Sequence, residues 1–165
     1  MKTKETQYIE NYLFKSCFGN HTKVAKEYGT AEVTIGFQRD GKGKERVDFL
    51  SFDAKNNIYR CYEIKVTLED LRSSAKKSWY GNYNYLVVTK ELYQKLSIEE
   101  WRLEIGVEVG LIVIDIGKGE KQTVIKSKYR DITEETTEML NKSLLRTLFY
   151  KSGKLERKKN GENIY

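Results

Sequence analysis

Two acidic residues and a lysine have the types and spacing of a divalent-metal site: Asp48, Glu63 and Lys65. Side chains alternate between the two faces of a strand, so Glu63 and Lys65 would point to the same face. The sequence predicts a hairpin in which a short turn sets Asp53 opposite Ile58. Counting back along both strands from this pair places Asp48 opposite Glu63. Opposed residues share a face with Cβ atoms about 5 Å apart, so this pairing gathers both carboxylates and the amine.

This arrangement would support metal-assisted hydrolysis. Two opposed carboxylates repel each other, and a divalent cation between them would remove the repulsion. Mg²⁺ or Mn²⁺ prefers oxygen ligands, and one or two carboxylates can hold Mg²⁺. Such an ion neutralises charge on a phosphodiester and acidifies an attacking water, while Lys65 could stabilise the developing charge. The plainer interpretation is a solvated charged face of a hairpin, and the spacing alone leaves it open.

The elements that must position these residues follow from hydrophobic periodicity. Tyr8, Ile9, Tyr12 and Leu13 recur at helical spacing, which predicts a first helix. Further helices are expected at 22–29, 68–79, 91–96, 98–103 and from 133 to about 149. Strands are expected as a meander over 32–37, 46–52 and 58–66, followed by 85–88, 109–116 and 123–127. This order predicts an α/β fold with a mixed central β-sheet, made of the three-strand meander plus further strands and flanked by helices.

The chain of 165 residues suits one domain, which we expect over 1–150, followed by a polar, flexible C-terminal tail over 151–165. Two cysteines, Cys17 and Cys61, are too few for a disulfide scaffold or a cysteine-based zinc site. The single histidine, His21, argues against a nuclease site of the HNH type, which needs several. No apolar run approaches the roughly 20 residues of a membrane span, and the start lacks the apolar core of a signal peptide. We therefore expect a cytoplasmic protein with no membrane partner.

The net charge of +6 and pI of about 9.1 fit a polyanionic partner such as nucleic acid, or simply a lysine-rich surface. Arg72, Lys76 and Lys77 follow the predicted site on an expected helix. They could contact nucleic-acid phosphates or form a solvated helix face, and charge alone leaves both interpretations open.

The segments Arg46-Val47-Asp48 and Tyr62-Glu63-Ile64-Lys65 resemble the motif of the PD-(D/E)XK nuclease superfamily, with Val47 at the proline position. A closer likeness is to MmcB-related DNA repair proteins, and it spans roughly residues 30 to 116. It also includes Glu32, Asp70-Leu71-Arg72, Lys77-Ser78-Trp79 and Gly110-Leu111-Ile112-Val113.

This resemblance implies a restriction-endonuclease-like core and a metal-dependent endonuclease that hydrolyses DNA with Mg²⁺ or Mn²⁺. By position, Asp48, Glu63 and the backbone carbonyl of Ile64 would bind the metal, and Lys65 would be the catalytic lysine. The likeness also implies a further glutamate. Glu32 is our prediction for it, with Glu10 on the first helix as the rival.

Two other functions remain open. The same fold could serve as a catalytically inactive DNA-binding or scaffold module, or as a nuclease directed at RNA. A homodimer would place one site on each strand of a duplex, and nothing in the sequence decides the oligomeric state.

Overall fold

A computed structural model describes residues 2–19, 23–36, 45–74 and 77–161. Within these residues, six strands form one sheet in sequential order, β1 to β6. The first three are antiparallel neighbours, β3, β4 and β5 run parallel, and β6 is antiparallel to β5. The strands are β1 (Tyr28–Thr34), β2 (Arg46–Asp53), β3 (Ile58–Lys65), β4 (Tyr83–Thr89), β5 (Gly110–Asp115) and β6 (Glu120–Ile125). The prediction of a mixed sheet that begins with a meander is confirmed.

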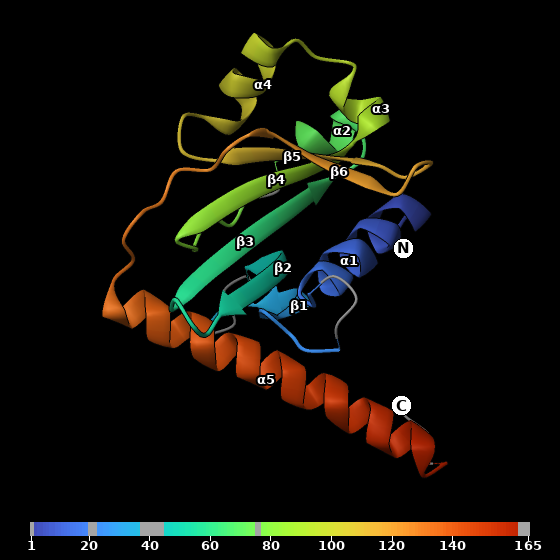
Figure 1. Cartoon of the computed structure of the whole chain (residues 1–165), viewed down its shortest axis with the longest axis vertical. Coiled ribbons are helices and arrows are strands. Elements are labelled where there is room, and N and C mark those ends of the chain that lie inside the picture. The colour runs from blue at the N-terminus through green and yellow to red at the C-terminus, as the bar shows by residue number, and fades with distance from the viewer. Residues whose placement is uncertain (1, 20–22, 37–44, 75–76, 162–165) are drawn as a thin grey trace.

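The helices divide between the two faces and the two ends of the sheet (Figure 1). In Figure 1, α2, α3 and α4 lie together above β4 and β5, whereas α5 runs along the opposite end of the molecule beside β1 and β2. Among the described residues, no helix is long and apolar enough to span a membrane. The helices are α1 (Lys4–Ser16), α2 (Leu68–Leu71), α3 (Lys90–Tyr93), α4 (Ile98–Ile105) and α5 (Glu134–Lys159).

Three hydrophobic clusters fill the layers. The α1 cluster consists of Ile9, Leu13, Cys17, Phe49, Ile64, Val87, Ile112 and Ile114. The α5 cluster consists of Val33, Ile35, Val47, Leu50, Tyr59, Cys61, Leu140 and Leu144. The α2–α4 cluster consists of Leu71, Leu86, Val88, Leu92, Trp101, Ile105, Val109, Leu111 and Val113.

Strand β3 shows how these clusters are arranged. Cys61 belongs to the α5 cluster and Ile64 to the α1 cluster, so the two clusters lie on opposite faces of the sheet. Glu63 and Lys65 share the face of Cys61 by alternation. They pair with Leu86 and Val88 of the α2–α4 cluster. A polar strip on β3 therefore lies where the α5 cluster ends and the α2–α4 cluster begins.

Two helices, α2 and α5, end far from the predicted residue. Helix α2 ends at Leu71 rather than near 79, and the Ser73 hydroxyl donates to the carbonyl of Asp70 there, so the serine competes for a helix-terminal acceptor. Helix α5 continues to Lys159, ten residues beyond the expected end. The segment 151–159 is therefore helical rather than a loose tail.

The extension of α5 has a local and a tertiary cause. Lys, Leu, Glu and Arg, which dominate this segment, are good helix formers, and the basic side chains in its last turn suit the helix C-terminus. The Lys151 ammonium also donates to the Thr30 hydroxyl and the Ala31 carbonyl, which ties the segment to β1.

The expected helix at 22–29 is not found in its described part, because β1 already begins at Tyr28. Gly29 lies inside the strand rather than at a helix end. A Cβ on Gly29 would lie 2.9 Å from the Phe49 ring and 3.0 Å from the Leu50 carbonyl oxygen. The glycine thus permits close approach of β1 to β2. Phe37, the expected end of this strand, and His21 lie outside the described residues.

Candidate metal centre

The turn between β2 and β3 fixes the geometry of the site. Asp53 Oδ1 accepts the backbone N–H groups of Lys55 and Asn56 at 3.1 and 3.2 Å, and Asn57 adopts a left-handed conformation with φ of 55°. Asp and Asn favour this conformation and side-chain capping within turns. The turn sets Asp53 opposite Ile58, and the pairing continues in the predicted register.

The backbone pairing of β2 with β3 ends just before Asp48, whose side chain bonds to β3 instead. The last pair recorded between the strands is Phe49 with Tyr62. One step further, Asp48 Oδ2 accepts the backbone N–H of Ile64 at 2.8 Å. This bond holds the Asp48 carboxylate against β3, next to Glu63, as the sequence predicted.

Glu63 is buried, with 4% of its surface exposed. Its Oε1 accepts the backbone N–H of Ser78 at 3.1 Å. Burial, and then the nearby charge of Asp48, raise the pKa of Glu63 to about 8. At neutral pH Glu63 therefore resists ionisation beside Asp48, and a cation between the two carboxylates would relieve that penalty. Sequence reasoning assigned no role to Ser78, although it lies in a segment that carries the family likeness.

Lys65 completes the polar strip and is 7% exposed. Its Nζ lies 3.0 Å from Asp70 Oδ1, so the buried ammonium has an acidic partner on α2. The Thr67 side chain caps α2 and accepts the backbone N–H of Asp70, and this bond fixes the position of the Asp70 backbone. Asp70 belongs to one of the segments quoted above for the sequence resemblance, but its pairing with Lys65 depends on the short turn into α2.

Glu32 is not brought together with the two carboxylates. It adopts a left-handed conformation, with φ of 57°, and its carboxylate pairs with Lys2 at 3.1 Å and Arg46 at 3.3 Å. Partial burial would raise the pKa of Glu32, but the hydrogen bond from Lys2 and the charges of Lys2 and Arg46 lower it. The rival, Glu10, also pairs with Lys2.

The acidic ligand set is accordingly small. Among the described residues, no group of three or more His, Cys, Asp and Glu side chains is placed to hold a metal ion. A cation at this position would rely on the carboxylates of Asp48 and Glu63, the predicted carbonyl of Ile64, and water. Mg²⁺ characteristically keeps several waters, so this donor set fits it.

Arg72 and Lys77, predicted to contact nucleic acid, do not share a helix face, because α2 ends at Leu71. Arg72 is exposed, and its Nε donates to Glu104 at 3.3 Å. Lys77 is half-buried and directly precedes Ser78, whereas Lys76 lies outside the described residues.

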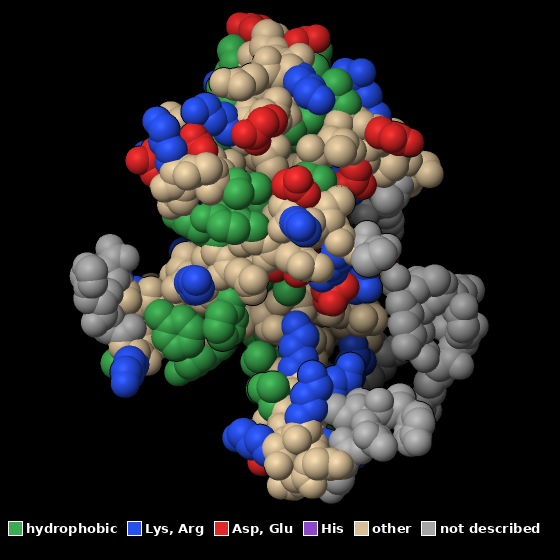
Figure 2. Space-filling model, turned by 90° about the vertical axis from the view of Figure 1, so that its right-hand side faces the viewer, with side chains coloured by type: hydrophobic (Ala, Val, Ile, Leu, Met, Phe, Trp, Pro, Cys, Tyr) green, Lys and Arg blue, Asp and Glu red, His purple; other side chains and the backbone are tan. Residues whose placement is uncertain are grey.

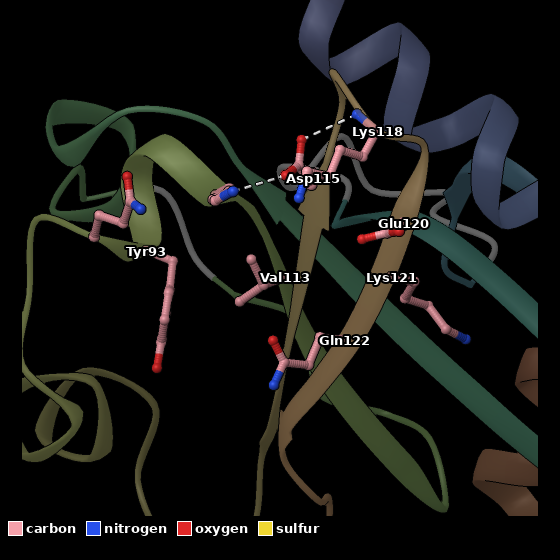
Figure 3. Close-up of a pocket in the computed structure, with 9 residues that line it drawn as sticks. Tyr93, Val113, Asp115, Lys118, Glu120, Lys121 and Gln122 are labelled. Atoms are coloured by element: carbon pink, nitrogen blue, oxygen red, sulfur yellow. Dashed lines mark hydrogen bonds and ion pairs between the residues drawn. The ribbon is translucent and has the colours of Figure 1, made fainter.

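A separate polar pocket of about 410 Å³ lies between α3 and the β5–β6 hairpin (Figure 3). Two of its charged side chains bind each other: Lys90 Nζ lies 2.8 Å from Asp115 Oδ2, and Asp115 Oδ1 accepts the Lys118 backbone N–H at 3.1 Å. These contacts tie α3 to the hairpin. Figure 3 shows the Lys121 side chain pointing away from this pocket.

No family model matches the sequence, and no curated protein is similar to it. Among solved structures, the chain is similar to a protein of unknown function from Silicibacter pomeroyi. The two share 16% sequence identity with a TM-score of 0.65, and the match covers 100% of this chain and 99% of that chain. At this identity the likeness shows a shared fold alone.

Proposed function

We propose that this protein is a metal-dependent endonuclease that hydrolyses DNA phosphodiester bonds. The observation that carries the proposal is the convergence of Asp48 and Glu63 from adjoining strands, with the pKa of Glu63 raised to about 8. A buried acid, Glu63, lies beside the half-buried carboxylate of Asp48 and next to a buried lysine, which is costly for folding and favours a site that binds a cation. The restriction-endonuclease-like core implied by the sequence motif is part of the same proposal.

Each residue has a distinct role in this reaction. Asp48 and Glu63 hold the metal through their carboxylates, and Ile64 contributes its backbone carbonyl. When bound, Mg²⁺ or Mn²⁺ would neutralise charge on the scissile phosphate and acidify the attacking water. Lys65 places a positive charge beside the phosphate and stabilises the charge that develops on its oxygens.

The surroundings of the site have roles of their own. The bonds from Ile64 to Asp48 and from Ser78 to Glu63 hold both carboxylates in place before a metal arrives. Arg72, which is exposed and pairs with Glu104, and half-buried Lys77 follow the site along the chain and would contact DNA backbone phosphates, and such contacts would make binding salt-dependent. We place this activity in the cytoplasm, as the sequence predicts.

The experiment is hydrolysis of supercoiled and linear duplex DNA with Mg²⁺ or Mn²⁺. We expect cleavage by the wild type and its loss, by two orders of magnitude or more, in Asp48→Ala and Lys65→Ala. Lys95→Ala, at an exposed position away from the site, is the matched control. Equal activity in all four proteins would reject the residue assignment. A matched RNA duplex separates DNA from RNA as substrate.

One observation favours a second function, a catalytically inactive DNA-binding or scaffold module. Among the described residues, only the acidic side chains of Asp48 and Glu63 come together at the candidate metal centre, since Glu32 pairs elsewhere. Titration calorimetry with Mn²⁺ distinguishes the two functions. Metal binding that Asp48→Ala abolishes supports the nuclease, whereas DNA binding without carboxylate-dependent metal binding supports the module.

A further inference from the structure

A groove with no part in the proposed reaction lies on the α1 face of the sheet. It is formed by two adjoining pockets near the C-terminal end of α1, of about 550 and 360 Å³. The two pockets share Ser16, Lys26 and Lys121, so they form one continuous depression. Volumes in this range suit small-molecule ligands.

Three lysines from separate segments line the larger pocket. Lys15 comes from the last turn of α1, Lys26 from the segment before β1, and Lys121 from β6. None of the described residues that line this pocket is acidic, and within the described part of the chain none of the three lysines forms an ion pair. Converging cations without a counter-charge favour a multiply charged anion.

The smaller pocket contains two acids, but both are already engaged. Glu27 pairs with Arg60 and accepts the Ser51 hydroxyl. Asp53 accepts the backbone N–H groups of the β2–β3 turn. Glu27 and Arg60 neutralise each other, and Asp53 keeps its negative charge, so Lys26 and Lys121 still leave this pocket with a net positive charge.

Aromatic rings give the smaller pocket an apolar lining beside these cations. Tyr62 and Tyr85 both line it and stack on each other, with ring centroids 5.6 Å apart and an interplanar angle of 17°. They are neighbours on β3 and β4. Tyrosine rings of this kind can accept the planar face of a nucleobase.

We propose that this groove binds a nucleotide. Its phosphates lie among Lys15, Lys26 and Lys121 in the larger pocket, and its base lies against Tyr62 and Tyr85 in the smaller one. Two sources have this chemistry, a free nucleoside triphosphate and the phosphorylated end of a nucleic-acid strand. The site lies on the opposite face of the sheet from Glu63 and Lys65, so it does not depend on the proposed nuclease activity.

The test is titration calorimetry in EDTA, which removes any contribution from metal. ATP and 5′-phosphorylated dT₄ are the two probes, and adenosine is the uncharged control. We expect the wild type to bind at least one phosphorylated probe, and the double variant Lys26→Glu/Lys121→Glu to bind it at least tenfold more weakly. Both lysines are exposed, so the double variant should fold, and circular dichroism verifies this. The tighter of the two probes identifies the source.

Three results would overturn the proposal. Wild-type protein that binds neither phosphorylated probe removes the site. A loss of equal size in Lys95→Glu shows that only net charge matters. Adenosine that binds as tightly as ATP removes the role of the lysines. Asp48→Ala should bind the probe like the wild type, so failure of the nuclease proposal leaves this result unaffected.

Discussion

The carboxylate of Asp48 accepts the backbone N–H of Ile64 at 2.8 Å, next to the last paired residues of β2 and β3. This single contact connects the proposed metal ligand on one strand to the backbone of the other. Burial raises the pKa of Glu63, and the charge of Asp48, held close by this contact, raises it further.

The stability of the metal-free protein should fall as pH rises through the titration of Glu63. Its folded pKa, about 8, lies above the ordinary 4.5, so the folded state binds a proton that the unfolded state releases. The stabilisation is fully present below about pH 4.5 and is lost toward pH 8, with a slope of up to about 1.4 kcal/mol per pH unit. Urea unfolding in EDTA at pH 5.5 and 7.5 measures it. Glu63→Gln, which cannot titrate, should reduce the slope by about one proton, and an unchanged slope contradicts the prediction.

Metal binding should stabilise the wild type and not Asp48→Ala. A ligand at 100 times its dissociation constant stabilises the folded state by about 2.7 kcal/mol. We therefore expect Mn²⁺ to raise the melting temperature of the wild type by several degrees in a thermal scan. Glu32→Ala should keep this response, because Glu32 pairs with Lys2 and Arg46 rather than with the site. A response lost equally in both variants would show that Glu32 joins the ligand set on binding.

Removing Asp70 should lower activity through Lys65. Asp70→Ala leaves the Lys65 ammonium, which is 7% exposed, without its partner at 3.0 Å. We expect a lower kcat for DNA cleavage with little change in Mn²⁺ affinity, and partial recovery in Asp70→Glu. The stability cost should be about 1 kcal/mol or less, because Asp70 is 45% exposed and solvent screens the pair. Full activity in Asp70→Ala would show that Lys65 needs no such support.

Two glycines should respond oppositely to substitution by alanine. Gly29→Ala places a Cβ within 3.0 Å of β2 atoms and should destabilise the protein by about 1–3 kcal/mol. Gly153→Ala lies within α5 with no atom within 4 Å of the new Cβ, and should stabilise it by up to about 1 kcal/mol. Chemical denaturation of both variants checks the signs. Destabilisation of similar size in both would contradict the close approach of β1 to β2.

The hairpin that carries the candidate site could be predicted from sequence because its determinants are local. Asp53 and Asn57 dictate the turn, the turn dictates the register, and the register places Asp48 next to Glu63. Strand alternation then places Lys65 without further information. Periodicity also identified the other strands to within a few residues.

The differences between the predicted and observed structure come mostly from contacts that local sequence patterns do not predict. Helix α2 stops early because a serine side chain competes for a carbonyl, and α5 is long partly because Lys151 reaches β1, over 100 residues away in sequence. Glu32 faces Lys2 and Arg46 because its backbone is left-handed, a conformation that glutamate rarely adopts. The Ser78 backbone N–H donates to the Glu63 carboxylate, a contact between residues 15 positions apart that the sequence pattern does not predict.

The polar strip of β3 between the α5 cluster and the α2–α4 cluster has a mechanical consequence. Glu63 and Lys65 belong to neither cluster, so polar side chains lie on β3 between the two clusters. The α2–α4 cluster and the α5 cluster can then unfold locally and independently of each other. We expect the backbone amides of α4 and α5 to show different free energies of opening in hydrogen exchange. A metal ion bound to the polar strip would connect the two clusters, so it should slow hydrogen exchange in both α4 and α5.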